Sequence, residues 1–220
     1  MIVDYEELIS GVDLIGDERE NCGGRHILVE NVLPSLDELS YEDYFGIRFL
    51  DIETTGLSGI TGPLFLIGLL EVGEEGILCS QLIAREPAEE SSILLELLSY
   101  VKERSCVMTF NGDNFDIPYI EKRMSYCNLT LPEIVSVDLL KPARKRYKDR
   151  LASCSLQSLE RNILKVPDWN REGDIPGSVI PRVYWEYVNC RNYGLLMPII
   201  KHNIMDLLST ARLWSMFMKP

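Results

Sequence analysis

Four acidic side chains, carried by three short segments far apart in the sequence, are the residues of this chain best suited to binding divalent cations. Asp51 and Glu53 lie within residues 49–57, Asp116 ends the segment 111–116, and Asp206 ends the segment 202–206. Hydrolysis of a phosphodiester with two such ions needs a cluster of carboxylates and a group that manages the attacking water. The three segments together therefore indicate a metal-dependent nuclease.

Asp51 and Glu53 alternate with apolar residues in a predicted strand, so their side chains point to the same face. Leu50 and Ile52 then face the opposite packing layer. Two neighbouring carboxylates repel each other and lose hydration, and a bound Mg²⁺ or Mn²⁺ relieves both costs because these hard cations prefer oxygen ligands. The alternative is an exposed strand end with solvated acids. Residues 54–56 supply a turn that a substrate backbone can approach closely.

Asp116 follows a predicted strand and opens a predicted helix. This position lies at the edge of a sheet, where α/β proteins commonly bind ligands. The alternative role for Asp116 is simple capping of the helix N-terminus. Asp113 in the same loop is interpreted as a turn residue.

His202 and Asp206 are four residues apart in a helical pattern and therefore share one face. Asp206 can complete a metal cluster while His202 reaches the attacking water. An imidazole with the ordinary pKa of about 6.5 suits a general base or a water-orienting group. The alternative is an ion pair on a solvated helix.

A basic tract at residues 141–150 stands out in this acidic chain. Its arginines and lysines can bind phosphates, and Tyr147 can stack on a base. A solvated helix surface is the alternative. Asp138, just before the tract, is interpreted as a strand-end or N-cap residue.

The composition is that of an ordinary globular domain, with 220 residues, 46% hydrophobic and 25% charged. The formal net charge of −12 argues against tight binding of long duplex nucleic acid, because phosphates repel an acidic protein. Two histidines and six cysteines without a C-x-x-C pair argue against a zinc cluster. The acidic N-terminus lacks a signal pattern, and the apolar run at 64–70 is far shorter than the roughly 20 residues that span a bilayer. We therefore expect a cytoplasmic protein with no membrane association.

The order of predicted elements favours an α/β fold. Residues 1–45 are expected to form an irregular N-terminal extension with two short strands, one at 26–29, and residues 46–220 the main domain. Strands are predicted at 47–53, 64–72, 77–83, 106–110 and 134–137. Helices are predicted at 89–103, capped by Ser91 or Ser92, and at 117–126, 155–164, 180–188 and 197–218. Strands followed by alternating helices and strands predict a mixed sheet flanked by helices, and the ribonuclease H-like fold has that order.

The three acidic segments resemble the Exo I, Exo II and Exo III motifs of the DEDD superfamily of 3′–5′ exonucleases. The third motif differs from its usual forms, because His202-x-x-x-Asp206 combines the spacing of the tyrosine subclass with a histidine. This combination, with Leu156–Glu160 and Asp174–Gly177, is similar to the YprB-like exonuclease family, over roughly residues 24–218.

The resemblance implies specific roles. It implies that Asp51, Glu53, Asp116 and Asp206 bind two Mg²⁺ or Mn²⁺ ions and that His202 orients or deprotonates the attacking water. It also implies that Thr54, Leu57, Asn111 and Phe115 lie near the terminal nucleotide. From the basic tract we expect Arg144, Lys145 and Arg146 to bind the strand.

The resulting hypothesis is a 3′–5′ exonuclease that acts on single-stranded ends of DNA or RNA by a two-metal mechanism. A structure-selective endonuclease with the same ribonuclease H-like fold is one alternative. A non-catalytic nucleic-acid-binding module is another, although clustered carboxylates that bind nothing are costly.

Overall fold

The computed structural model describes residues 16–33, 44, 46–74, 76–164 and 174–218. In this part of the chain a seven-stranded mixed sheet has the order β1-β2-β5-β4-β3-β6-β7. The strands are β1 (Asp17–Asn21), β2 (Gly24–Leu33), β3 (Ile47–Thr54), β4 (Leu64–Val72), β5 (Ile77–Ile83), β6 (Cys106–Thr109) and β7 (Val135–Asp138). The pairs from β1 to β3 are antiparallel, whereas β3–β6 and β6–β7 are parallel.

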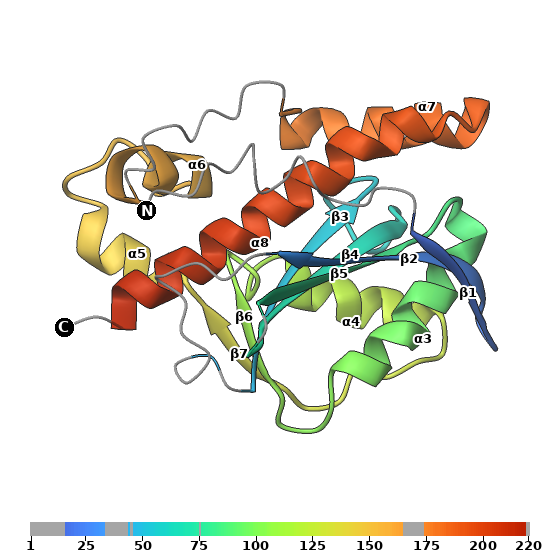
Figure 1. Ribbon diagram of the computed structural model, residues 1–220, viewed down its shortest axis with the longest axis horizontal. Coiled ribbons are helices and arrows are strands. Elements are labelled where there is room, and N and C mark those ends of the chain that lie inside the picture. The colour runs from blue at the N-terminus through green and yellow to red at the C-terminus, as the bar shows by residue number, and fades with distance from the viewer. Residues whose placement is uncertain (1–15, 34–43, 45, 75, 165–173, 219–220) are drawn as a thin grey trace.

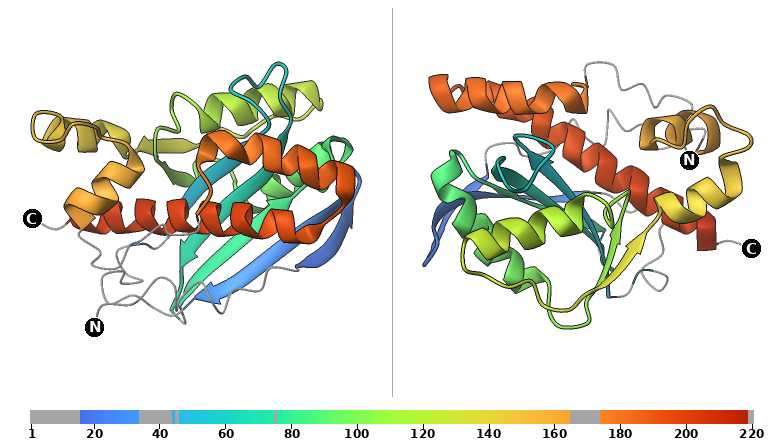
Figure 2. Two further views of the ribbon diagram at one scale, coloured as in Figure 1. Left: turned by 90° about the horizontal axis from the view of Figure 1, so that it is seen from above. Right: turned by 180° about the vertical axis from the view of Figure 1, so that it is seen from behind.

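Helices cover both faces of the sheet (Figures 1 and 2). The long helix α8 (Leu196–Met218) crosses one face, over β3 and β4, and α3 (Glu90–Tyr100) and α4 (Asp116–Tyr126) lie on the other. The remaining helices are α5 (Leu140–Tyr147), α6 (Leu156–Leu159), which continues into a π-helical turn at Glu160–Leu164, and α7 (Ile180–Cys190). The predicted mixed sheet flanked by helices is confirmed.

The predicted strands of the main domain all form, within a residue or two of the expected ends. β4 is the most buried of them, with Leu64, Phe65, Ile67 and Leu70 fully inaccessible. Its continuous apolar sequence is explained by this position between two helical layers.

Two predictions on the first long helix were wrong. The helix ends at Tyr100 rather than 103, because Val101 turns to an extended conformation and packs into the core. Neither Ser91 nor Ser92 caps it, since Glu89 holds the cap position without a side-chain bond. The hydroxyl of Ser92 instead donates to the carbonyl of Gly24.

Residues 17–33 are more ordered than expected of an irregular extension. The predicted strand at 26–29 is part of the ten-residue β2, which pairs with β5 along its length. Ile27, Leu28 and Val29 are buried in the core, and this burial explains why the segment joins the sheet. The other residues of 1–45, apart from Gly16 and Tyr44, lie outside the described residues. We propose that β1 and β2 belong to the main domain.

The acidic segments come together where the neighbouring strands β3 and β6 separate. The β3–β6 ladder pairs only residues 47–49 with 106–108. Beyond Phe49 the two strands separate. The following residues of β3, which pair only with β4, include Asp51 and Glu53. The N-terminus of α4 enters the resulting gap, and α8 passes over it from the other side.

Candidate active site

Asp51 and Glu53 lie near the C-terminal end of β3 on the face covered by α8. Asp51 is partly exposed and Glu53 is 8% exposed. Burial, followed by the charges of Asp206, Glu53 and Asp116, raises the pKa of Asp51 well above its usual value. Burial is also the largest cause that raises the pKa of Glu53 to about 8, although the charge of His202 opposes it. These carboxylates are therefore close enough to repel one another, as the sequence predicted for one strand face.

Asp116 joins this group from the first position of α4. Its Oδ1 accepts a hydrogen bond from the backbone N–H of Ile52, at 3.2 Å, on the separated length of β3. Asp116 does more than cap the helix, because Phe115 holds the cap position and the Asp116 carboxylate joins α4 to β3. Burial, assisted by the charges of Asp138 and Asp206, raises the pKa of Asp116 to about 7 despite two backbone hydrogen bonds.

His202 and Asp206 reach the same region from α8. The Nε2 of His202 lies 3.7 Å from Oδ2 of Asp206, while its Nδ1 contacts the Asp174 carboxylate at 2.8 and 3.0 Å. Burial lowers the pKa of His202, but the Asp174 hydrogen bond and the charges of Asp206 and Glu53 outweigh it and raise the pKa to about 9. The expected ordinary imidazole pKa was therefore wrong. The imidazole keeps its proton at neutral pH as long as these carboxylates are ionised.

The ligand chemistry of the site fits small divalent cations. Within the described residues, no three histidine, cysteine, aspartate or glutamate side chains are already arranged as ligands of a single ion. Burial and the charges of neighbouring carboxylates nonetheless raise the pKa of Asp51, Glu53 and Asp116, and so oppose their ionisation. A hard cation would relieve this repulsion through oxygen ligands. The fit is thus one of ligand type and charge, rather than of a preformed cage.

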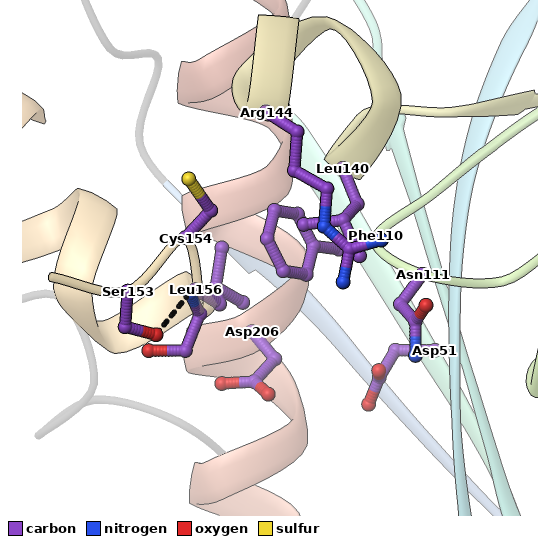
Figure 3. A pocket seen from close by; sticks show the side chains of 10 residues that line it. Asp51, Phe110, Asn111, Leu140, Arg144, Ser153, Cys154, Leu156 and Asp206 are labelled. Carbon is purple, nitrogen blue, oxygen red and sulfur yellow. Dashed lines mark hydrogen bonds between the residues drawn. The ribbon is translucent and has the colours of Figure 1, made fainter. Parts of the chain in front are cut away.

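A cavity of about 420 Å³ opens beside these carboxylates (Figure 3). Asp51 from β3 and Asp206 from α8 line it, and Arg144 extends toward it from α5. The other lining residues are Phe110, Asn111, Leu140, Ser153, Cys154, Ser155 and Leu156. Acidic and basic groups thus share a space large enough for a nucleotide-sized ligand.

The predicted substrate residues divide into two groups. Asn111 and Arg144 line the cavity. The others do not: Thr54 is buried and its hydroxyl donates to the carbonyl of Gly56, Leu57 is 93% exposed, and Phe115 packs on the ring of Tyr119.

Within the basic tract, the structure distinguishes Arg144 from its neighbours. Lys145 is exposed outside the cavity. Arg146 donates to the carbonyl of Phe217 and lies over its ring, with the guanidinium carbon 4.8 Å from the ring centroid. Arg146 is therefore engaged with the C-terminal end of α8.

Three residues near the site were not predicted to act there. Asp174 orients His202, and its only signal in the sequence was its place in the segment 174–177 quoted for the resemblance. Asn203 donates to Asp51 Oδ2 at 2.8 Å, and no sequence signal marked it. Asp138 ends β7, as one of its two predicted roles had it, and its Oδ1 accepts from Leu140 N at the start of α5 at 2.9 Å. The same oxygen also accepts from Asn111 N at 2.7 Å and so fixes the loop before Asp116.

Comparisons with known proteins agree with this architecture. The family model of the RNase H superfamily matches residues 48–218. A relative from Bacillus subtilis (strain 168), described as uncharacterized protein YprB, is 34% identical over 170 residues, which are 76% of this chain. The chain spans only 40% of that relative's length.

Among solved structures, the family B DNA polymerase from the hyperthermophilic archaeon Pyrobaculum calidifontis is similar, with a TM-score of 0.60 and 16% identity over 97% of this chain and 30% of the polymerase chain. Escherichia coli exonuclease I in complex with an oligonucleotide matches with 15% identity over 69% of this chain and 44% of that chain. Its TM-score of 0.42 is too low to establish a common fold. The predicted ribonuclease H-like fold and the resemblance to YprB are confirmed, and the chain belongs to the RNase H superfamily.

Proposed function

We propose that this chain is a metal-dependent 3′–5′ exonuclease that acts on single-stranded ends of DNA or RNA. The observation that carries the proposal is that Asp51, Glu53 and Asp116 each have a pKa raised by burial and by the charge of Asp206, although the four residues come from three distant segments. Asp51 and Asp206 also line the cavity. Membership of the RNase H superfamily supports a nuclease reaction. The 3′–5′ polarity rests on the order and form of the three motifs.

The four carboxylates would hold two Mg²⁺ or Mn²⁺ ions. When bound at such a site, divalent ions supply an activated water and neutralise the charge that develops on the leaving oxygen. The protein itself supplies the rigid support for the ligands: Asp116 is tied to β3 through Ile52, and His202 is tied to Asp174. Such fixed groups need little reorganisation during the reaction.

His202 would act on the attacking water through Nε2. Its Nδ1 is committed to Asp174, so Nε2 is the ring nitrogen that faces Asp206 and the carboxylate group. A carboxylate on Nδ1 fixes both the tautomer and the orientation of the ring. Cations placed among these acids would lower the pKa of the imidazole and permit proton transfer.

A single-stranded end is the substrate that the cavity suits best. Phe110 offers an aromatic surface, Asn111 a polar amide, and Arg144 a cation for a phosphate. The net charge of −12 disfavours broad contact with duplex nucleic acid, so binding would depend on this local group and on metal.

A cytoplasmic location is part of the proposal. All six cysteines are free, which is the usual state in a reducing compartment. Among the described residues, no helix is both long and apolar enough to cross a membrane.

Incubation of the protein and Mn²⁺ with 3′- and 5′-labelled oligonucleotides tests the proposal. We expect mononucleotides to be released from the 3′ end of a single strand, and Asp116→Asn to slow the release at least about 100-fold. Cleavage of a circular single strand into fragments would instead identify an endonuclease. No hydrolysis with either Mg²⁺ or Mn²⁺ would reject a nuclease function.

A further inference from the structure

A row of three residues crosses the sheet directly beneath the proposed site. Asp51 on β3 pairs with Gly68 on β4, and Gly68 pairs with Gln81 on β5. Directly opposed residues of antiparallel strands place their side chains on the same face. Asp51 and Gln81 therefore stand on the α8 face with a glycine between them, and the missing side chain leaves a notch in this face.

Asn203 of α8 fills this notch. Its Nδ2 donates to the Asp51 carboxylate at 2.8 Å and to the Asp51 carbonyl at 3.3 Å. Its Oδ1 accepts from Nε2 of Gln81 at 2.8 Å, and the same Gln81 nitrogen donates to the carbonyl of Ile200 at 3.0 Å. Asn203 and Gln81 are completely buried. The side chain of Asn203 is thus held at both ends by the sheet.

Gly68 is necessary for this arrangement. A Cβ at position 68 would lie 2.0 Å from Oδ1 of Asn203, far closer than non-bonded atoms approach. A glycine in the interior of a central strand is unfavourable unless another group must come close. Here the group that comes close is the one that contacts the proposed metal ligand.

Asn203 also fixes the position of α8 along the sheet. His202 precedes it, and Asp206 follows three residues later on an adjoining part of the helix surface. A shift of α8 by one residue would move both groups by about 1.5 Å along the helix axis. The contact between Asn203 and Asp51 therefore fixes the position of Asp206 on α8 relative to Asp51 on β3.

We propose that Asn203 is a positioning residue that fixes Asp51 relative to Asp206, and that Gly68 and Gln81 form the seat that holds it. This inference rests on the proposed function, because it assigns Asn203 a task toward the metal ligands. It predicts that substitutions at Asn203, Gly68 or Gln81 weaken metal binding although all four carboxylates are still present.

Four variants of the full chain test the seat. Asn203→Ala removes both contacts, and Gly68→Ala displaces Asn203 by steric overlap alone. Leu213→Ala truncates another fully buried side chain of α8, and Gly73→Ala adds a methyl group beyond the end of β4, where the nearest atom is 3.4 Å away. The last two variants control for lost stability and for the glycine substitution itself.

The primary measurement is Mn²⁺ affinity by calorimetry, with single-strand hydrolysis as the second. We expect Asn203→Ala and Gly68→Ala to weaken Mn²⁺ binding by about 10- to 100-fold, the usual effect of losing a group that orients a metal ligand. The turnover number should fall with little change in the KM for oligonucleotide. The Leu213→Ala and Gly73→Ala variants should stay within about twofold of wild type in both measurements.

A double variant makes the test more specific. Once Asn203 is alanine, the methyl group at position 68 no longer meets an amide, so Gly68→Ala should add almost nothing to the loss. If Asn203→Ala does not fold, Gln81→Met gives a milder test, and we expect it to weaken Mn²⁺ binding several-fold.

The outcomes separate this inference from the proposed function. Losses of Mn²⁺ affinity and turnover that appear in Asn203→Ala and Gly68→Ala but not in the two controls, and that do not add in the double variant, support the inference. Variants that lower the Tm but keep wild-type Mn²⁺ affinity and turnover would overturn it, while nuclease activity stands. A wild type that binds Mn²⁺ but releases no nucleotide would reject the function and leave the seat to be judged by Mn²⁺ affinity. A wild type that binds no Mn²⁺ would overturn both.

Discussion

Two regions of this protein bury charged side chains, and they treat them in opposite ways. Between α3, α4 and β4, Glu90 and Arg123 are 4% and 6% exposed and form an ion pair. Glu90 Oε1 also accepts from Leu64 N at 2.7 Å, and Arg123 Nη1 donates to Gly59 O at 3.3 Å. At the proposed active site, by contrast, burial and the charges of neighbouring carboxylates, Asp206 among them, raise the pKa of Asp51, Glu53 and Asp116.

The difference separates a structural use of buried charge from a functional one. Glu90 and Arg123 compensate each other within the fold, and the hydrogen bond with Glu90 raises the pKa of Arg123. The acids of the site are held close although repulsion opposes their ionisation. Such strongly shifted pKa values are typical of functional sites. The pair and the site should therefore respond oppositely to loss of a carboxylate.

Asp116→Asn should produce the largest effect on activity and none of the usual loss of stability. We expect hydrolysis to fall at least about 100-fold, the scale of one lost electrostatic contact at an active site. The metal-free protein should become more stable at pH 8, because one repelling charge is gone while Oδ1 can still accept from Ile52 N. Initial rates and thermal unfolding in EDTA measure the two effects. A lower Tm together with full activity would contradict the distinction.

Glu90→Gln should do the reverse. Loss of one partner leaves Arg123 buried without its counter-charge, at a cost of about 3–5 kcal/mol in the free energy of unfolding. Hydrolysis measured well below the Tm should stay within about threefold of wild type, since the pair lies on the other face of the sheet from α8. Denaturant unfolding and the same rate assay test this. A variant as stable as wild type would show that the pair is no structural counterpart to the site.

The pH dependence of stability should show the site directly. Folding raises the pKa of Glu53 to about 8, of Asp116 to about 7 and of His202 to about 9, so the folded protein retains protons that the unfolded chain would release. The stability of the metal-free protein should thus fall as pH rises from about 5 to about 9. One pKa unit corresponds to about 1.4 kcal/mol and 1 kcal/mol to about 2–4 °C, so we expect a fall in Tm of roughly 5 °C or more.

Mn²⁺ should restore this lost stability, and more at pH 8.5 than at pH 6, because the ions replace the protons. Thermal unfolding in EDTA and in Mn²⁺ at both pH values is the measurement, with Asp116→Asn as the control that reduces the pH dependence. An equal Mn²⁺ effect at both values would argue that the cation binds elsewhere.

The smallest predicted effect distinguishes two neighbours on α5. Arg144→Gln should weaken binding of a single-stranded oligonucleotide several-fold and reduce the slope of its salt dependence by about 0.7, since Arg144 lines the cavity. Lys145→Gln removes an equal charge outside the cavity and should change affinity less than twofold. Fluorescence anisotropy at several salt concentrations measures both. Equal effects would mean that the tract acts only through its total charge.

The sequence was most informative where a pattern is local. The apolar run of β4 and the alternation of β3 each identify a strand, and the spacing of His202 and Asp206 fixes their common helix face. The order of the acidic motifs was sufficient to propose which carboxylates meet.

What could not be predicted depends on contacts between distant residues. The pKa of His202 depends on Asp174, which lies in a different part of the chain. The role of Asn203 becomes visible only when the register places Asp51 beside Gly68 and Gly68 beside Gln81. Likewise, Arg146 and Lys145 look equivalent to Arg144 in sequence, and only the direction of α5 shows that Arg144 alone of the three lines the described cavity.

Anomalous diffraction from a crystal of the protein soaked in Mn²⁺ with a mononucleotide would show whether the four acidic side chains bind metal. We expect two manganese peaks about 3.5–4 Å apart, ligated by carboxylate oxygens of Asp51, Glu53, Asp116 and Asp206. Manganese bound only at other acidic positions, with these four carboxylates making no contact to it, would show that they do not form a metal site.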